Sequence, residues 1–316
     1  MNEETNRIAI EEMWEEARGE LNKEVFDFND IQKIKELRFF DRFDNMFTTS
    51  GEFAVVKLSD IDLLLRSCNG EENDKGRFRS LKEEDGEKWE LNKDKLSTNR
   101  YNDPKRGFMY FGISMKNKTK SRKFVKTTCA KEIRAFKDEK EYISTLEFKV
   151  KNECKEKEVL DFSKISNYYS CDDIEKEMNR FGNELANMYI DIIFKKEKNF
   201  PINVFANPIC VDKRKMMKEI LENPIVKVLN EIILSDYLVK IFLKLINDAT
   251  FTEVNIAGDK RKEVYAPFHA FANYIEDKGY SGIIYNSTVH HNGLNLVLFE
   301  RDDVEFYGDI EIERKK

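Results

Sequence analysis

Apolar residues in the first part of the chain recur every three or four positions, which is the spacing of one buried face of an α-helix. Two such series are present: Ile8, Met13, Trp14, Ala17 and Leu21, then Ile31, Ile34, Leu37 and Phe40. An aromatic cluster follows at Phe39–Phe47. Core packing explains this cluster better than a cofactor site does, because aromatic side chains dominate buried contacts. The segment Ser59–Leu65 is expected to form another short helix with Ser59 as its cap.

These series predict a helical N-terminal region over residues 1–68. The polar, glycine-flanked run at residues 69–76 is the best boundary in the chain. Strand-like segments follow it, at Phe108–Phe111, Tyr142–Val150 and Val159–Phe162. Helical spacing returns afterwards. We therefore expect an α+β protein, with a second region over residues 76–310 that contains a helical insertion at about 165–250.

A strand, a polar loop and a second strand are expected at residues 279–299, after a helix over Tyr265–Ile275. The loop holds Asn286, Ser287, His290 and His291. Functional residues are often found on such loops, although a solvated hairpin tip would show the same pattern. The two histidines have no third ligand at metal-binding spacing, so no metal site is expected.

Composition narrows the class of protein. The chain has 316 residues, of which 41% are hydrophobic, enough for one large core or two modest ones. The 54 Lys and Arg nearly balance the 60 Asp and Glu, and a net charge of −6 gives no overall footprint for nucleic acid. A basic segment at Lys116–Lys126 could meet phosphates but is typical of a solvated loop.

Three further features favour a cytoplasmic protein. Residues 1–20 are acidic and lack the layout of a signal peptide. The most apolar window, residues 220–246, is interrupted by charged side chains and therefore predicts buried helices and no membrane span. The five cysteines are scattered without a C-x-x-C pair, which argues against disulfides or zinc and for a reducing compartment.

Five short blocks occur in an order that resembles the RES-domain family, named for its Arg, Glu and Ser. They are Asn99–Asn102, Gly107–Gly112, Ala130–Glu132, Gly279–Ser287 and Gly293–Phe299. The resemblance implies a fold similar to the ADP-ribosyltransferase toxins, with a small mixed sheet. It also implies a site that binds NAD as its substrate and breaks the nicotinamide–ribose bond. The biological role that it implies is the toxin of a toxin–antitoxin pair, with an antitoxin protein as partner.

Matching the family motif assigns residues to the site. The family arginine falls on Arg100, the glutamate on Glu132 and the serine on Ser287, and these three are the expected catalytic residues. The residues expected to contact NAD are Arg100, Tyr101, Tyr110, Ser287 and Asn295.

The chemistry of these side chains fits that assignment. Cleavage builds positive charge on the ribose, which a carboxylate such as Glu132 would stabilise more in the transition state than in the ground state. The guanidinium of Arg100 can hold a pyrophosphate through two hydrogen bonds. Tyr110 could stack on a nicotinamide or adenine ring, and Ser287 could bond to a ribose hydroxyl or a phosphate.

The sequence leaves the acceptor of the ADP-ribosyl group open between water, phosphate and a protein side chain. A second hypothesis is an inactive nucleotide-binding or interaction protein built on the helices. The helical insertion and residues 1–70 have no counterpart in the minimal family member. We favour inhibition by a separate antitoxin over an internal lock, because residues 1–70 are expected to pack as a unit with their own aromatic core.

Overall fold

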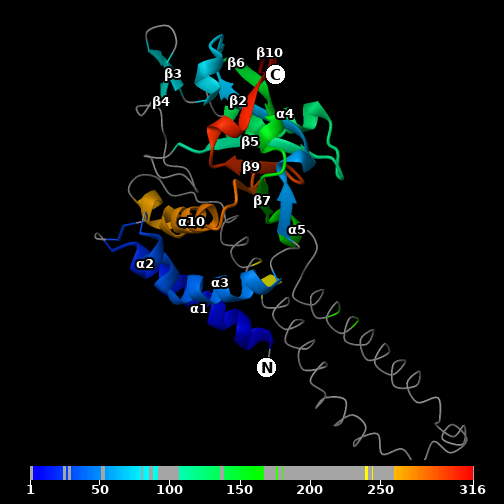
Figure 1. Ribbon diagram of the computed structural model, residues 1–316. Helices are drawn as coiled ribbons and strands as arrows, with labels where there is room; N and C mark the ends of the chain where they lie inside the picture. Colours follow the sequence, from blue (N-terminus) through cyan, green and yellow to red (C-terminus); the bar gives the residue numbers. More distant parts are fainter. Residues whose placement is uncertain are drawn as a thin grey trace, which may run out of the picture.

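The computed structural model describes residues 3–23, 26–27, 30–50, 54–79, 81–84, 88–91, 107–135, 139–166 and 260–315, with a few isolated positions between them (Figure 1). Arg100 and Tyr101 lie outside the described residues, as does nearly all of the expected insertion at 165–250. The described part is α+β, as the sequence predicted.

The described strands form one eight-stranded mixed sheet and a separate hairpin. The order in the large sheet is β1-β7-β8-β9-β5-β2-β6-β10, in which only the β7–β8 pair is parallel. Its strands are β1 (Val55–Lys57), β2 (Ile61–Asn69), β5 (Met109–Met115), β6 (Tyr142–Val150), β7 (Glu158–Asp161), β8 (Gly282–Asn286), β9 (Leu294–Leu298) and β10 (Val304–Arg314). The hairpin pairs β3 (Leu81–Glu84) with β4 (Lys88–Leu91).

One face of the sheet encloses a core of its own. Val56 of β1 and Val304 of β10 are at opposite ends of the strand order, yet both belong to the same buried cluster as Phe111 and Leu296. Lys157, just before β7, forms an ion pair with Asp303, just before β10, so the sheet curls and brings these distant strands together, as the right-handed twist of strands favours. Short 3₁₀ turns complete this side: η2 (Leu58–Asp60), η3 (Lys75–Arg79), η6 (Asn152–Cys154) and η7 (Arg301–Asp303).

The other face carries the helices. Figure 1 shows α10 (Lys260–Asp277) between the sheet and the N-terminal helices α1 (Glu3–Leu21), α2 (Ile31–Glu36) and α3 (Arg38–Ser50). A second core fills this layer, and its buried members include Phe39, Phe40 and Phe43 of α3 with Phe271 of α10. The prediction that the aromatic cluster packs in a core is therefore confirmed.

A polar contact also joins the helices to each other. The Tyr274 hydroxyl of α10 donates to Asp44 of α3, and Lys278 forms an ion pair with the same carboxylate. Tyr274 is fully buried, and its hydroxyl gains a charged acceptor there. This contact ties the N-terminal helices to the helix that leads into β8.

The prediction of a helix at Ser59–Leu65 is wrong. The prediction that the whole of residues 1–68 is helical is wrong as well. β1 and β2 are strands, and β2 lies in the middle of the sheet between β5 and β6. Leu64 and Leu65 are both buried, one on each face. A strand covered on both faces has a continuous apolar run, which periodicity cannot distinguish from a buried helix. The division of the chain near residues 69–76 stays a prediction.

Another local prediction needs correction. Residues 122–126 of the expected basic loop form the first turns of helix α4 (Arg122–Glu132). Residues Lys75–Arg79, at the end of the expected boundary, form the 3₁₀ turn η3. By contrast, β6, β7, α10 and the strand–loop–strand unit β8–β9 occur where the sequence predicted them. Among the described helices, none combines the length and apolar character needed to cross a membrane.

Candidate active site

Helix α4 carries the candidate catalytic glutamate at its last residue. Ser121 caps the helix by accepting a hydrogen bond from the backbone N–H of Phe124. The buried side of α4 presents Val125 and Cys129 to Leu65 of β2. Glu132, at the other end, is exposed.

A glycine allows α4 to lie close to the sheet. A Cβ atom at Gly112 of β5 would stand 2.5 Å from the sulfur of Cys129, closer than real side chains approach. Cys129 donates from its thiol to the carbonyl of Leu65, at 3.2 Å. Burial raises the pKa of this thiol to about 12, so it stays protonated and serves packing, with no role as a nucleophile.

The loop between β8 and β9 folds back on itself through backbone hydrogen bonds. The N–H of Ser287 donates to the carbonyl of Gly293 at 2.8 Å, and the N–H of Gly293 donates to the carbonyl of His290 at 2.9 Å. The Ser287 hydroxyl oxygen accepts from the N–H groups of His290 and Val289, at 3.0 and 3.3 Å. These bonds fix the position of the Ser287 hydroxyl within the loop.

The glutamate and the serine meet. The Ser287 hydroxyl donates to Oε1 of Glu132 at 2.6 Å, and the side-chain amide of Asn295 donates to the same oxygen at 2.6 Å. Within the described part of the chain, no hydrogen bond reaches Oε2. One carboxylate oxygen is thus held by two donors, while the other is left open on an exposed residue.

The loop lies along one stripe of α4. Phe124, Thr128 and Glu132 are four residues apart and therefore share a helix face. The His290 ring packs on Phe124 with centroids 4.4 Å apart, and its Nδ1 is 2.7 Å from the Thr128 hydroxyl. Gly293 lies against Thr128 so closely that an added Cβ would be 2.9 Å from both the methyl carbon and the hydroxyl oxygen.

The pKa of His290 is lowered in this position. Its partial burial and the nearby positive charge of Lys131 lower the pKa of the imidazole below its ordinary value. A neutral ring is therefore favoured near neutral pH, and it can pack on Phe124 without the cost of burying a charge.

Tyr110 lies on the same face of the sheet as this cluster. Tyr110 and Gly112 are two residues apart on β5 and point to one side, which is the side that Cys129 contacts. Their partners on β9 are Val297 and Asn295. Tyr110 is half-buried in the row next to Asn295.

The structure brings together three of the expected site residues, Glu132, Ser287 and Asn295. The resemblance also assigns Arg100 and Tyr101 to the site, but both lie outside the described residues. Among the described residues, no group of three or more His, Cys, Asp or Glu is placed so that it could hold a metal ion.

Sequence reasoning did not find the contacts that join the loop to α4. It considered His290 as one of several polar loop residues and as a possible metal ligand, and it assigned Asn295 to NAD. The available signal was the four-residue spacing of Phe124, Thr128 and Glu132, which the Lys-rich composition of the segment obscured. The approach of Gly293 to Thr128 depends on tertiary structure and has no local signature.

The comparison with protein families agrees with the resemblance drawn from the sequence. The family model described as the RES domain matches residues 226–314, a segment that contains α10, the Ser287 loop and strands β8 to β10. The resemblance carried by the blocks at Gly279–Ser287 and Gly293–Phe299 is thereby confirmed. Glu132 precedes the matched segment. Neither a curated protein nor a solved structure matches the chain.

Proposed function

We propose that this chain cleaves NAD between nicotinamide and ribose, with Glu132 as the catalytic carboxylate. The observation that carries the proposal is the asymmetric hold on Glu132, in which Ser287 and Asn295 donate to Oε1 while no described residue donates to Oε2. The RES match supports it at the level of the family. We also propose that the fold is related to that of the ADP-ribosyltransferase toxins.

The proposed chemistry requires a fixed negative charge beside the sugar. When the bond breaks, its electron pair leaves with the nicotinamide nitrogen, and positive charge develops over the ribose carbon and ring oxygen. A carboxylate oxygen at that place lowers the energy of the transition state more than that of the ground state. Because two donors already orient Glu132, little reorganisation is needed during the reaction.

Ser287 takes a different role from the one that the sequence suggested. Its single hydroxyl proton is donated to Glu132, and its oxygen already accepts two backbone N–H groups. A hydroxyl has one proton and two lone pairs, so these three bonds use its full capacity. We therefore assign Ser287 to the orientation of Glu132 in place of a direct bond to NAD, and Asn295, which donates to the same oxygen, to the same orienting role beside its expected contact with NAD.

The remaining roles follow the resemblance. Tyr110 lies on the correct face to stack on a ring of NAD, and Arg100 and Tyr101 would hold the pyrophosphate and the adjacent ribose. With water or phosphate as acceptor, the reaction would deplete the NAD of the cell, which is the action of a toxin. An antitoxin that covers the surface around Ser287 and Glu132 would then control it.

The direct test is nicotinamide release from NAD by the purified chain, followed by liquid chromatography with and without phosphate. Glu132→Gln is the main variant, because its amide oxygen can still accept from Ser287 and Asn295 while the charge is lost. We expect its turnover to fall by about 10²-fold or more, the effect of removing one preorganised electrostatic group. Glu156→Gln is the matched control, since Glu156 is an exposed glutamate paired with Lys57.

The outcomes separate the alternatives. Release that depends on phosphate indicates a phosphorylase, and release without phosphate indicates a glycohydrolase. Transfer of ADP-ribose to an added protein would indicate a transferase. Binding of NAD without any nicotinamide release would refute the proposal and favour the nucleotide-binding alternative. Wild-type turnover in Glu132→Gln would remove Glu132 from the catalytic role.

A further inference from the structure

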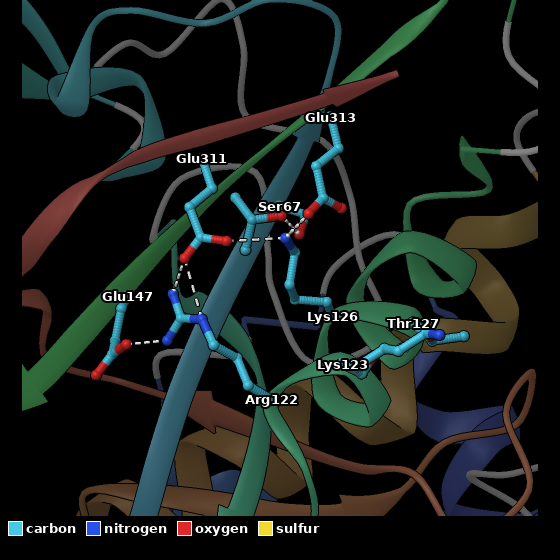
Figure 2. A network of polar contacts seen from close by, with 9 residues as sticks. Ser67, Arg122, Lys123, Lys126, Thr127, Glu147, Glu311 and Glu313 are labelled. Carbon is cyan, nitrogen blue, oxygen red and sulfur yellow. Dashed lines mark hydrogen bonds and ion pairs between the residues drawn. The ribbon is translucent and has the colours of Figure 1, made fainter. Parts of the chain in front are cut away.

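A network of charged side chains connects helix α4 to the C-terminal strand. Arg122 and Lys126 of α4 point towards β10, where Glu311 receives both of them (Figure 2). The Nε of Arg122 donates to Oε1 of Glu311 at 3.0 Å, and Lys126 donates to Oε2 at 2.9 Å. Glu147 of β6 completes the network on Arg122, and Glu313 of β10 completes it on Lys126.

The network is partly shielded from water. The side chains of Lys126 and Glu147 are only 15% and 18% exposed, and that of Glu311 is 40% exposed. Ion pairs in such places are screened less than those on open surface. Burial alone would raise the pKa of Glu311, yet the pKa lies below its ordinary value because Lys126 and Arg122 stabilise the carboxylate.

The buried apolar contact of α4 with the sheet covers a single turn of the helix, from Val125 to Cys129. The buried cluster between α4 and β2 has three members, Leu65, Val125 and Cys129. The closest approach is at Cys129, whose sulfur occupies the space that Gly112 leaves empty. A helix that packs on the sheet along one turn can still tilt, so its orientation also depends on the polar contacts made before and after that turn.

Cys129 divides the helix into two arms of similar length. Lys126 precedes it by three residues and Glu132 follows it by three, which at 1.5 Å per residue is about 4.5 Å along the axis on each side. A tilt of α4 about Cys129 that displaces Lys126 would therefore displace Glu132 by about the same amount in the opposite direction. A misplacement of 1 Å at a catalytic group can cost about 10²-fold in rate.

We propose that Lys126 and Glu311 are positioning residues, which set the place of Glu132 by holding the opposite arm of α4. The inference rests on the proposed cleavage of NAD. It assigns to β10 a function in the reaction, although no residue of the network contacts Glu132.

The experiment is a double-mutant cycle on the full chain, with Lys126→Met, Glu311→Gln and both together. Methionine retains most of the aliphatic stem of lysine, so packing is conserved while the charge is removed. We expect each single change to lower kcat for nicotinamide release by about tenfold with KM nearly unchanged. The kcat of the double variant should be no lower than that of the less active single variant, because the two changes remove the same interaction. Circular dichroism would confirm that each variant is folded at the assay temperature.

The matched control is the exposed pair of Lys57 and Glu156, whose side chains are 50% and 75% exposed. Glu156→Gln should leave kcat unchanged, because Lys57 ends β1 and Glu156 precedes β7, at the other end of the strand order from β10. A loss of kcat in this control equal to that in Glu311→Gln would overturn the inference, since any lost surface charge would then suffice.

A second measurement does not depend on catalysis. Amide hydrogen exchange over residues 129–133 should become faster in Lys126→Met and Glu311→Gln, and should not change in Glu156→Gln. Wild-type kcat together with unchanged exchange would overturn the positioning role. If the wild-type chain releases no nicotinamide, the proposed function fails, whereas faster exchange in these variants would still show that the pair positions this end of α4.

Discussion

Substituting Gly293 by alanine tests the contact that brings the Ser287 loop onto α4. The added Cβ would lie 2.9 Å from two atoms of Thr128 and 3.0 Å from the carbonyl oxygen of His290. Thr128 cannot easily turn away, because its hydroxyl contacts both the Phe124 carbonyl and His290. The loop itself must therefore move.

The size of that movement follows from contact distances. Carbon atoms in favourable contact are about 3.5–4.0 Å apart, so the loop must retreat by about 0.6–1 Å. Overpacking of this kind costs about 1–3 kcal/mol of the free energy of unfolding. The same retreat would lengthen the 2.6 Å bond between Ser287 and Glu132, and a shift near 1 Å predicts a loss of turnover of up to about 10²-fold.

Two assays would measure these effects: unfolding in urea and nicotinamide release at saturating NAD. Gly19→Ala is the matched control, because Gly19 lies in helix α1 with nothing within 4 Å of its added Cβ. The control should gain about 0.5–1 kcal/mol, since alanine is the better helix former. If Gly293→Ala had wild-type stability and turnover, the packing of the loop on α4 would be refuted.

Three further predictions concern single side chains. Burial and the charge of Lys131 lower the pKa of His290. The stability that the neutral ring contributes is therefore present above about pH 6.5 and is lost as the pH falls through the folded pKa. Urea midpoints between about pH 5 and 7.5 should vary less in His290→Asn than in the wild type. Tyr274→Phe should cost about 1.5–3 kcal/mol in urea unfolding, because its buried hydroxyl donates to the charged Asp44. Cys129, whose pKa is about 12, should resist iodoacetamide in the native protein and react once urea unfolds it, as peptide mass spectrometry would show.

The strand–loop–strand unit could be predicted from the sequence because its signals are local. Strand-forming residues flank a polar loop, and the structure has β8 and β9 on either side of Ser287. The prediction of a helix at Ser59–Leu65 was wrong because the structure of this segment is not set by a local signal. Its leucines are buried by different layers on the two faces of β2, and no local pattern shows how many faces of a segment are covered.

The arrangement of the site could be predicted only in part. The family resemblance assigned Glu132 and Ser287 to one site, and the structure shows the hydrogen bond that joins them. The ionic network was beyond reach, because it depends on the register of β10. That register shifts between Tyr307 and Glu311, where Gly308 adopts a φ of +71°. Such an irregularity decides which glutamates face α4 and leaves little trace in composition.

The separation of Glu132 from its two orienting partners has a consequence during synthesis on the ribosome. Ser287 follows Glu132 by 155 positions and Asn295 follows it by 163. A nascent chain that has displayed α4 but not yet β9 has a glutamate without either donor, and the pairing of β5 with β9 that would bring them together has not formed. On the proposed function, a fragment that ends before residue 287 lacks both donors to Glu132, and we expect it not to cleave NAD.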